Sequence, residues 1–356
     1  MQPNWGTPRN PYNNQYYCGG SSGGSAYAVS SGLLPITLGV DGGGSIRIPA
    51  SFCGIYGLKP SHGRVGQSQT TVSANGPLAA SISDLEVAYR VMAVPDPNNP
   101  VAGLFSCPRP QLEPRSKIIG IYKPWFDGAD PLVHGRCNEI VEYFHKSLGY
   151  EVIPIELPRL REGQLAHAFT ILAEMASLAK LTSPPPRNWL SDLNPANKVL
   201  MSVGNQTPAA DYLLAQRMRQ LLMCHLAYLF QEHPGLVIVT PTNPGAGWPI
   251  TAESDLKYGI SNGNASIRNM EYVWLANFTG CPAISCPAGY LAPAKGKGVN
   301  EIPVGIMAMG EWGTEDALIE WGRNAEKWLN EVHQGGRKRP ENWEDVLKGA
   351  REEMKK

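Results

Sequence analysis

The sequence predicts an α/β protein built on a single large mixed β-sheet with helices on both of its sides. Apolar runs of strand length alternate along the chain with longer segments of helical periodicity. In one alternation, a strand at 117–123, a helix at 134–149 and a strand at 150–158 follow one another as in a β-α-β unit. The 356 residues, 42% hydrophobic and 17% charged, are enough to bury a sizeable core.

The elements before this unit are short. Small residues at 25–34 predict a helix that packs closely against a neighbour, and the apolar run at 34–41 predicts a buried strand. Residues 51–65 predict a turn, a strand and a loop. A Ser/Asp start predicts a helix over 81–94. Its apolar residues recur at helical spacing: Leu85, Ala88, Val91 and Met92.

The second half continues the alternation. Two helices, 163–182 and 208–232, are joined by a connection broken by prolines. The remaining elements are a strand at 235–243, a helix within 263–280, strands at 281–287 and 304–310, and a helix at 315–332.

Composition excludes several classes of function. The 31 basic and 31 acidic residues cancel, so no basic field is available for a nucleic acid. No apolar run is long enough to span a membrane, so no membrane partner is expected. The seven cysteines include no CxxC pair, which argues against a zinc site and against a disulfide framework. A reducing location, the cytoplasm, is therefore expected.

The most informative stretch runs from Gly19 to Pro49 and reads GGSSGGSAYAVSSGLLPITLGVDGGGSIRIP. A flexible linker would be polar throughout, whereas here glycine clusters alternate with apolar runs that belong in a core. Such clusters indicate tight turns and close approach of the backbone to a ligand. The triple glycine is not a phosphate-binding P-loop, because no GK[ST] follows it, and GGSIR is not a GxSxG nucleophile elbow.

Several motifs in order resemble the amidase signature family: GGSSGGS, DGGGSIRIP, FCGIYGLKPSHGRV, and NFTGCPAISCPAG followed by VGIMAMG. The resemblance covers most of residues 6–330. GTPRNPYNNQYYCGGSSGG is most similar to the fungal-type, acetamidase-like branch. The resemblance implies a family domain at 1–335 that lacks its usual N-terminal part, followed by a charged C-terminal tail at 336–356.

The family uses a Ser-Ser-Lys triad, and the resemblance assigns two of its members here. Ser45 corresponds to the acylated nucleophile. Ser21 corresponds to the bridging serine, whose peptide bond with Gly20 is cis in the family. The loop Gly42, Gly43 and Gly44 matches the one whose N–H groups form the oxyanion hole, and side chains there would keep a carbonyl oxygen away from these donors.

Other residues near the site are expected to have supporting roles. Asp41 and Arg47 flank the glycine loop and are expected to hold its shape by hydrogen bonds. Ser22 is expected near the substrate, with Ser22 and Ser25 capping the following helix. His62 is expected to make a loop hydrogen bond, and Cys53 to lie in the core.

The resemblance implies a small-molecule amide and water as substrates, with no metal and no organic cofactor, and the amide could be a small aliphatic, an aryl or a fatty amide. A homodimer is compatible with the sequence. The pocket lining is expected from residues 164–230 and from the loop at 240–248.

The base of the triad is missing. In the family it is a neutral lysine upstream of the bridging serine, but none of the 20 residues before Ser21 is a lysine. The first lysine, Lys59, matches a structural position of the family. Three interpretations follow: the natural N-terminus is absent from this sequence, the chain is an inactive homologue that only binds, or a local residue replaces the lysine. An A-type amidotransferase component of a transamidating complex is a further alternative.

Overall fold

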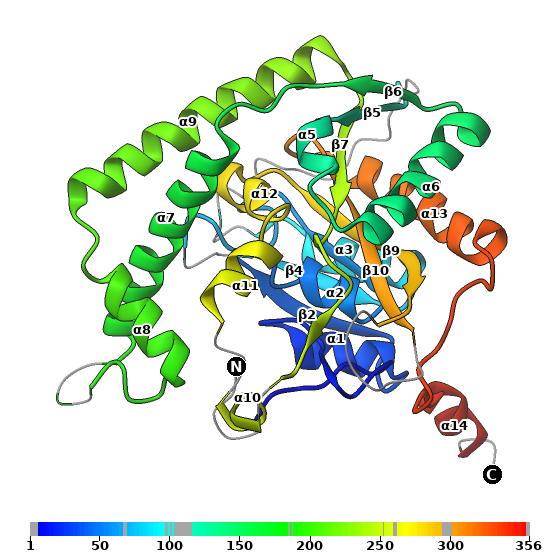
Figure 1. Ribbon diagram of the computed structural model, residues 1–356, viewed down its shortest axis with the longest axis horizontal. Helices are drawn as coiled ribbons and strands as arrows, with labels where there is room; N and C mark the ends of the chain where they lie inside the picture. The colour runs from blue at the N-terminus through cyan, green and yellow to red at the C-terminus, as the bar shows by residue number, and fades with distance from the viewer. Residues whose placement is uncertain are drawn as a thin grey trace.

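The computed structural model describes residues 6–66, 70–96, 99, 102, 116–183, 186, 188–251, 253–258, 262–293 and 301–353. Its centre is a mixed sheet of eight strands (Figure 1). The strands are β2 (Ile36–Asp41), β3 (Tyr56–Lys59), β4 (Ala74–Ala79), β5 (Ile118–Ile121), β6 (Glu151–Pro154), β7 (Leu236–Pro241), β9 (Ala283–Leu291) and β10 (Ile302–Met309). Their order is β2-β4-β3-β9-β10-β7-β5-β6, antiparallel as far as β7 and parallel from β7 to β6.

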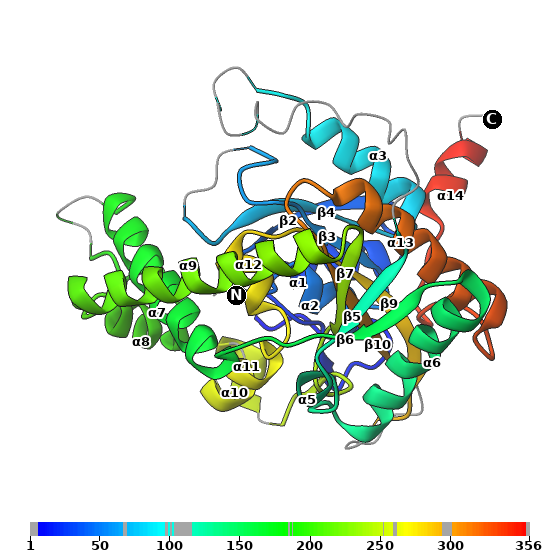
Figure 2. The same cartoon turned by 90° about the horizontal axis from the view of Figure 1, so that it is seen from above.

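Two layers of helices cover this sheet (Figure 2). One layer holds α3 (Ile82–Met92), α6 (Pro131–Leu148) and α13 (Glu315–Lys327), which continues as a π-helical turn, η1 (Trp328–Val332). Phe144 of α6 and Trp321 of α13 meet there with ring centroids 5.0 Å apart. The opposite layer holds α1 (Gly23–Ser30), α2 (Arg47–Phe52) and α12 (Trp274–Thr279), and the short α5 (Lys123–Phe126) lies near β7.

Three helices form an arm at one side of the body (Figures 1 and 2). They are α7 (Leu160–Leu181), α8 (Pro195–Gly204) and α9 (Ala209–Glu232). The smaller helix α11 (Gly263–Asn269) contacts the start of α7, where Gln164 donates to the Ile267 carbonyl, and α10 (Glu253–Tyr258) contacts the N-terminal segment, where the N–H of Thr7 donates to the Leu256 carbonyl. In the part of the chain that the structure describes, no helix is both long and apolar enough to cross a membrane.

The chain ends also contact the body. A two-stranded sheet joins β1 (Tyr16–Tyr17) to β8 (Trp248–Pro249). Residues 337–344 then pack along α1 before the terminal helix α14 (Val346–Glu353). The N–H of Glu344 donates to the carbonyl of Ser31 at 2.9 Å, and Asn342 donates to the Tyr27 hydroxyl at 2.7 Å.

The predicted fold class is confirmed, and so is the β-α-β unit. The parallel neighbours β5 and β6 are joined by α6. This helix begins with Pro131 in its first turn and ends at Gly149, whose φ of 72° suits a left-handed C-cap.

The strand predicted at 34–41 is present as β2, but the prediction that it is buried was wrong. The strand β2 is at the edge of the sheet, where Leu38 is 58% and Val40 is 51% exposed. The elements that were not predicted include α2, the strand β4, and α8 within the proline-broken connection. Two of them adjoin the glycine loop, because α2 follows it and β4 pairs with β2, the strand that precedes it.

Candidate active site

The glycine loop Gly42–Ser45 connects the edge strand β2 to α2. Gly44 has a φ of +100°, and a Cβ there would lie 2.5 Å from Cγ2 of Val273 on the neighbouring segment. Only glycine fits this position, because any other residue would have a strained backbone here and its Cβ would overlap Val273. The loop is therefore held against the segment that leads into α12.

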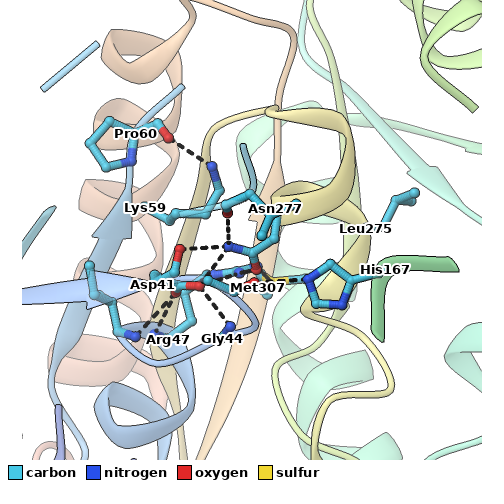
Figure 3. Close-up of polar contacts among 12 residues, drawn as sticks. Asp41, Gly44, Arg47, Lys59, Pro60, His167, Leu275, Asn277 and Met307 are labelled. Carbon is cyan, nitrogen blue, oxygen red and sulfur yellow. Dashed lines mark hydrogen bonds and ion pairs between the residues drawn. The ribbon is translucent and has the colours of Figure 1, made fainter. Parts of the chain in front are cut away.

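A buried ion pair closes the base of the loop (Figure 3). The Asp41 carboxylate accepts hydrogen bonds from Nε and Nη2 of Arg47, both at 3.0 Å, and neither side chain is exposed. It also accepts from the N–H of Gly44 at 2.7 Å and of Ile46 at 3.1 Å. Burial by itself would raise the pKa of Asp41, but the Arg47 guanidinium outweighs it and holds this pKa far below its usual range.

Asn277 of α12 completes this buried cluster. Its amide nitrogen donates to the Asp41 carbonyl at 2.7 Å and to the Asp41 carboxylate at 3.0 Å, while its oxygen accepts from Nη2 of Arg47 at 2.5 Å. The remaining guanidinium nitrogen, Nη1, faces the Met307 sulfur at 3.2 Å. Asn277 belongs to the NFTG motif of the sequence, but its contact with the loop, 236 residues away, is visible only in the structure.

Three peptide groups of the loop are fixed through their carbonyl oxygens. These hydrogen bonds are Asn277 Nδ2 to Asp41 O at 2.7 Å, His167 Nε2 to Gly42 O at 2.8 Å, and Ile48 N to Gly44 O at 2.7 Å. In a trans peptide the carbonyl and the N–H point in opposite directions. Each bond therefore also sets the direction of the N–H that follows it.

The N–H groups set in this way belong to Gly42, Gly43 and Ser45. Among the described residues, none of these three donors has a hydrogen-bond acceptor. The expectation for Gly44 is corrected, because its N–H donates to Asp41 and cannot also bind a substrate oxygen. The roles of Gly42 and Gly43 as substrate donors stay predictions.

The two serine segments meet beside the loop. The peptide bond between Gly20 and Ser21 is cis, in agreement with the resemblance. The N–H of Ser22 donates to the Ser45 carbonyl at 3.2 Å. Ser21 is exposed, while Ser22 and Ser45 are half-buried.

The capping role expected for Ser22 and Ser25 was wrong. Ser22 is at the N-cap position of α1, but its side chain makes no capping hydrogen bond. Its hydroxyl instead lies 2.7 Å from the point that a Cβ on Gly39 would occupy, so it packs against β2. The Ser25 hydroxyl donates to the Leu38 carbonyl of β2 at 3.0 Å.

The other titratable groups near the site have structural contacts. Lys59 is buried, and its Nζ donates to the Pro60 carbonyl at 2.7 Å. Burial and then the charge of Arg47 lower the pKa of Lys59 to about 7. His62 makes its loop contact through Nδ1 to the Ser73 carbonyl at 3.1 Å, and Cys53 lies fully in the core.

Sequence reasoning did not find His167 on α7. The imidazole is buried, and burial lowers its pKa to about 4, so the ring is neutral near pH 7. Ile171, one turn further along α7, lies 3.0 Å from the point that a Cβ on Gly42 would occupy. The helix α7 brings His167 and Ile171 to the glycine loop, while the expectation that residues 164–230 and 240–248 line the pocket stays a prediction. No local pattern in the sequence marks His167.

The sequence and fold can now be compared with those of known proteins. The Amidase family model matches residues 2–319. The chain belongs to the amidase signature family. It is 33% identical to a fatty acid amide hydrolase of Medicago truncatula over 97% of this chain and 56% of the relative. It is 31% identical to the A-type component of the glutamyl-tRNA(Gln) amidotransferase of Thermus thermophilus over 87% of this chain and 68% of the relative.

Among solved structures, the A-type component of the Thermotoga maritima amidotransferase superposes with a TM-score of 0.73, covering 94% of this chain and 71% of that one at 23% identity. This likeness confirms the fold of an amidase signature protein. The chain spans about half the length of the plant fatty acid amide hydrolases that it matches, 56% in the Medicago protein.

Proposed function

We propose that this amidase signature chain forms the acyl-transfer site of an amide hydrolase, with Ser45 as nucleophile. The observation that carries the proposal is the set of three N–H groups, of Gly42, Gly43 and Ser45, without acceptors among the described residues. Donors aimed at a developing oxyanion lower a barrier by about 3–4 kcal/mol each. The buried Asp41–Arg47 pair and Asn277 hold these donors in place and take no part in the chemistry.

The proposed proton transfers use Ser21 and Ser45 in the roles that the resemblance assigns them. Ser21 accepts the proton of the Ser45 hydroxyl and passes its own proton to the base as the Ser45 oxygen bonds to the amide carbon, and the carbonyl oxygen gains the negative charge. Ser21 then donates a proton to the nitrogen as the C–N bond breaks, which releases the amine and leaves an ester on Ser45. Water attacks this ester through the reverse transfers, giving the carboxylic acid and free Ser45.

This relay needs a base next to Ser21. The chain has no lysine before Lys59, and Nζ of Lys59 is hydrogen-bonded to Pro60. We therefore assign the base to no residue of this chain. Loss of a general base costs about 10²–10⁴-fold in rate, so residues 1–356 by themselves should react slowly.

The substrate proposed is an amide with a long apolar acyl chain. Curated relatives at 32–33% identity are named fatty acid amide hydrolases, from Medicago truncatula, Oryza sativa and Arabidopsis thaliana. Among the small aliphatic, aryl and fatty amides that the resemblance left open, these names favour a fatty amide. No metal or organic cofactor enters this mechanism.

The exposure of Ser21 suggests a direct test, rescue by an added amine. Release of p-nitroaniline from decanoyl p-nitroanilide is measured with increasing ethylamine at several pH values. We expect a low basal rate that rises in proportion to the free-base amine. Ser45→Ala should abolish both rates, and Ser21→Ala should abolish the rescue.

Two outcomes would contradict the proposal. Absence of turnover with and without ethylamine, together with no labelling of Ser45 by a fluorophosphonate, would favour the inactive, binding homologue. A fast basal rate that ethylamine does not change would show that a residue of this chain supplies the base. Acetyl p-nitroanilide is the matched substrate that tests the acyl-chain preference.

A second candidate is the A-type amidotransferase component, which the 31% identity to the Thermus thermophilus protein favours. Such a chain would release ammonia from glutamine and would work in a complex. Ammonia release from glutamine that exceeds anilide hydrolysis would select it. Sedimentation of the purified chain tests the homodimer, and fractionation of cells tests the cytoplasmic location.

A further inference from the structure

We propose that His167 is a positioning residue that aims the Gly43 N–H at the acyl pocket beside Ser45. The proposal rests on the proposed function, because it concerns one of the three donors of that site. His167 acts through the peptide group between Gly42 and Gly43 and does not touch the reacting atoms. Nothing in the residues around position 167 indicates this role from sequence.

The hydrogen bond fixes the protonation of the ring. Nε2 of His167 lies 2.8 Å from the Gly42 carbonyl oxygen, which can only accept. The proton therefore resides on Nε2, and the neutral ring leaves Nδ1 unprotonated. The pKa of about 4, lowered by burial, keeps the ring in this neutral form through the neutral range.

The ring itself has little room to move. Phe278 of α12 lies edge-on to it at 6.0 Å between centroids. Cε1 of His167 and the Met270 sulfur are each 3.3 Å from the point that a Cβ on Gly43 would occupy. The imidazole is thus packed against the peptide that it binds.

The hydrogen bond acts on the donor in two ways. It orients the peptide, so that the Gly43 N–H points away from α7. It also polarises the amide, because a carbonyl that accepts a hydrogen bond makes the N–H of the same peptide a stronger donor. Both effects strengthen binding of a negatively charged oxygen more than binding of a neutral amide.

The first measurement is the tautomer of His167. Labelling with ¹⁵N-histidine gives the imidazole signals of the seven histidines, and the pair lost in His167→Gln belongs to this residue. We expect a protonated Nε2 and an unprotonated Nδ1 at pH 7. A proton on Nδ1 would place the Nε2 lone pair against the Gly42 oxygen and would overturn the proposal.

The second measurement observes the Gly43 amide directly. The chain is labelled with glycine that carries ¹³C in its carbonyl and ¹⁵N in its amide. A spectrum that detects only ¹⁵N bonded to ¹³C then shows the glycine amides that follow another glycine, of which the chain has five. Gly42→Ala removes the label before Gly43 and so identifies its signal. We expect this signal to shift in His167→Phe and to stay near its original position in His167→Gln.

Glutamine is the conservative variant, because its Nε2 is the same number of bonds from Cα as that of histidine. The matched control is Gln164→Ala on the same helix, which removes a surface hydrogen bond to Ile267 and should not move the Gly43 signal. An unchanged Gly43 signal in a folded His167→Phe variant would overturn the proposal. So would an equal shift in the glutamine variant, since that indicates packing alone.

Reaction with a fluorophosphonate then links the donor to chemistry. We expect Ser45 labelling to slow about 10- to 100-fold in His167→Phe and only a few-fold in His167→Gln. If the unaltered chain does not react at all, the proposed function fails, while the two spectroscopic results still decide what His167 does. A His167→Phe variant that keeps the full labelling rate of a reactive chain would overturn the positioning role.

Discussion

At the scale of single residues, the site depends on charges that are completely out of water. Asp41 and Arg47 form a buried pair, and Asn277 satisfies atoms of both. A buried pair contributes little net stability by comparison with apolar residues, but removal of one partner leaves an uncompensated charge. The pair fixes the shape of the loop. Its effect on the free energy of unfolding becomes large only when one partner is removed.

Replacing Arg47 by Met should destabilise the protein by about 3–5 kcal/mol, because the Asp41 carboxylate would remain buried without its counter-charge. Urea unfolding of the variant measures this loss. The double variant Asp41→Asn with Arg47→Met should recover part of it, since no unpaired charge then remains. A loss below about 1 kcal/mol in the single variant would contradict the importance of the buried pair.

Lys59 should make stability depend on pH. Burial lowers its pKa from 10.5 to about 7 in the folded protein, so between these values the unfolded chain binds a proton that the folded chain does not. The free energy of unfolding should therefore rise with pH above about 7, by roughly 1.4 kcal/mol per pH unit at most. Below about pH 7, Lys59 is protonated in both the folded and the unfolded chain and should add no pH dependence.

Urea unfolding between about pH 7 and about pH 8 checks this slope below the range in which unfolded cysteines ionise, because burial raises the pKa of Cys53, Cys137, Cys281 and Cys286 in the folded protein and would give an opposite slope. Lys59→Met removes the titrating group and should lose most of the slope. An equal slope in Lys59→Met would assign the effect to another group.

At the scale of elements, the loop depends on an edge strand that is covered on only one side. Gly39 of β2 faces Ser22 and Ile46, so its neighbours in the strand point to the opposite face. Those neighbours, Leu38 and Val40, are more than half exposed. An edge strand with exposed apolar residues is a site where chains associate.

Leu38→Lys should change the free energy of unfolding by no more than about 0.5 kcal/mol, because the side chain is largely in water already. It should also reduce association at high concentration, since an edge charge opposes strand pairing. Light scattering measures association, and Leu78→Lys on β4, a fully buried site, is the contrasting variant that should fail to fold. Strong destabilisation by Leu38→Lys would show that this face is covered in solution.

At the scale of the whole molecule, segments far apart in the sequence support the site and the chain ends. Residues 337–344 pack on the N-terminal segment and on β9: Tyr12 and Tyr290 donate to the Lys338 carbonyl at 3.0 and 3.1 Å, respectively. Arg337 also lies over the Tyr56 ring, 5.6 Å from its centroid. The segment after residue 335, predicted from its charge as a tail, therefore makes specific contacts where the structure describes it.

Deletion of residues 337–356 should lower stability by about 2–4 kcal/mol, because several hydrogen bonds and the cover over Tyr12 and Tyr290 are lost. Thermal unfolding of the shortened chain measures the effect. Deletion of residues 346–356 alone is the control and should change little, since most of α14 is exposed. Equal stability of both shortened chains and the full chain would support the predicted domain boundary at 335.

The glycine loop and its serines could be predicted, because close backbone approach leaves a local mark in the form of consecutive glycines. The position of β2 at the sheet edge could not, because its run ITLGVD has the composition of a core strand and exposure depends on its neighbours. His167 and Asn277 support the loop from 125 and 236 residues away, and such contacts have no local signature.

These long separations have a consequence for how the protein matures. The glycine loop and its adjoining ion pair are encoded within seven consecutive residues, 41–47, yet the loop's carbonyls are tethered from α7 and α12. A nascent or partly folded chain would carry the nucleophile without a shaped pocket around it. Ser45 would then become reactive only late in folding, when the last distant helix packs against the loop. Its reactivity would therefore be a stricter measure of completed folding than helix content.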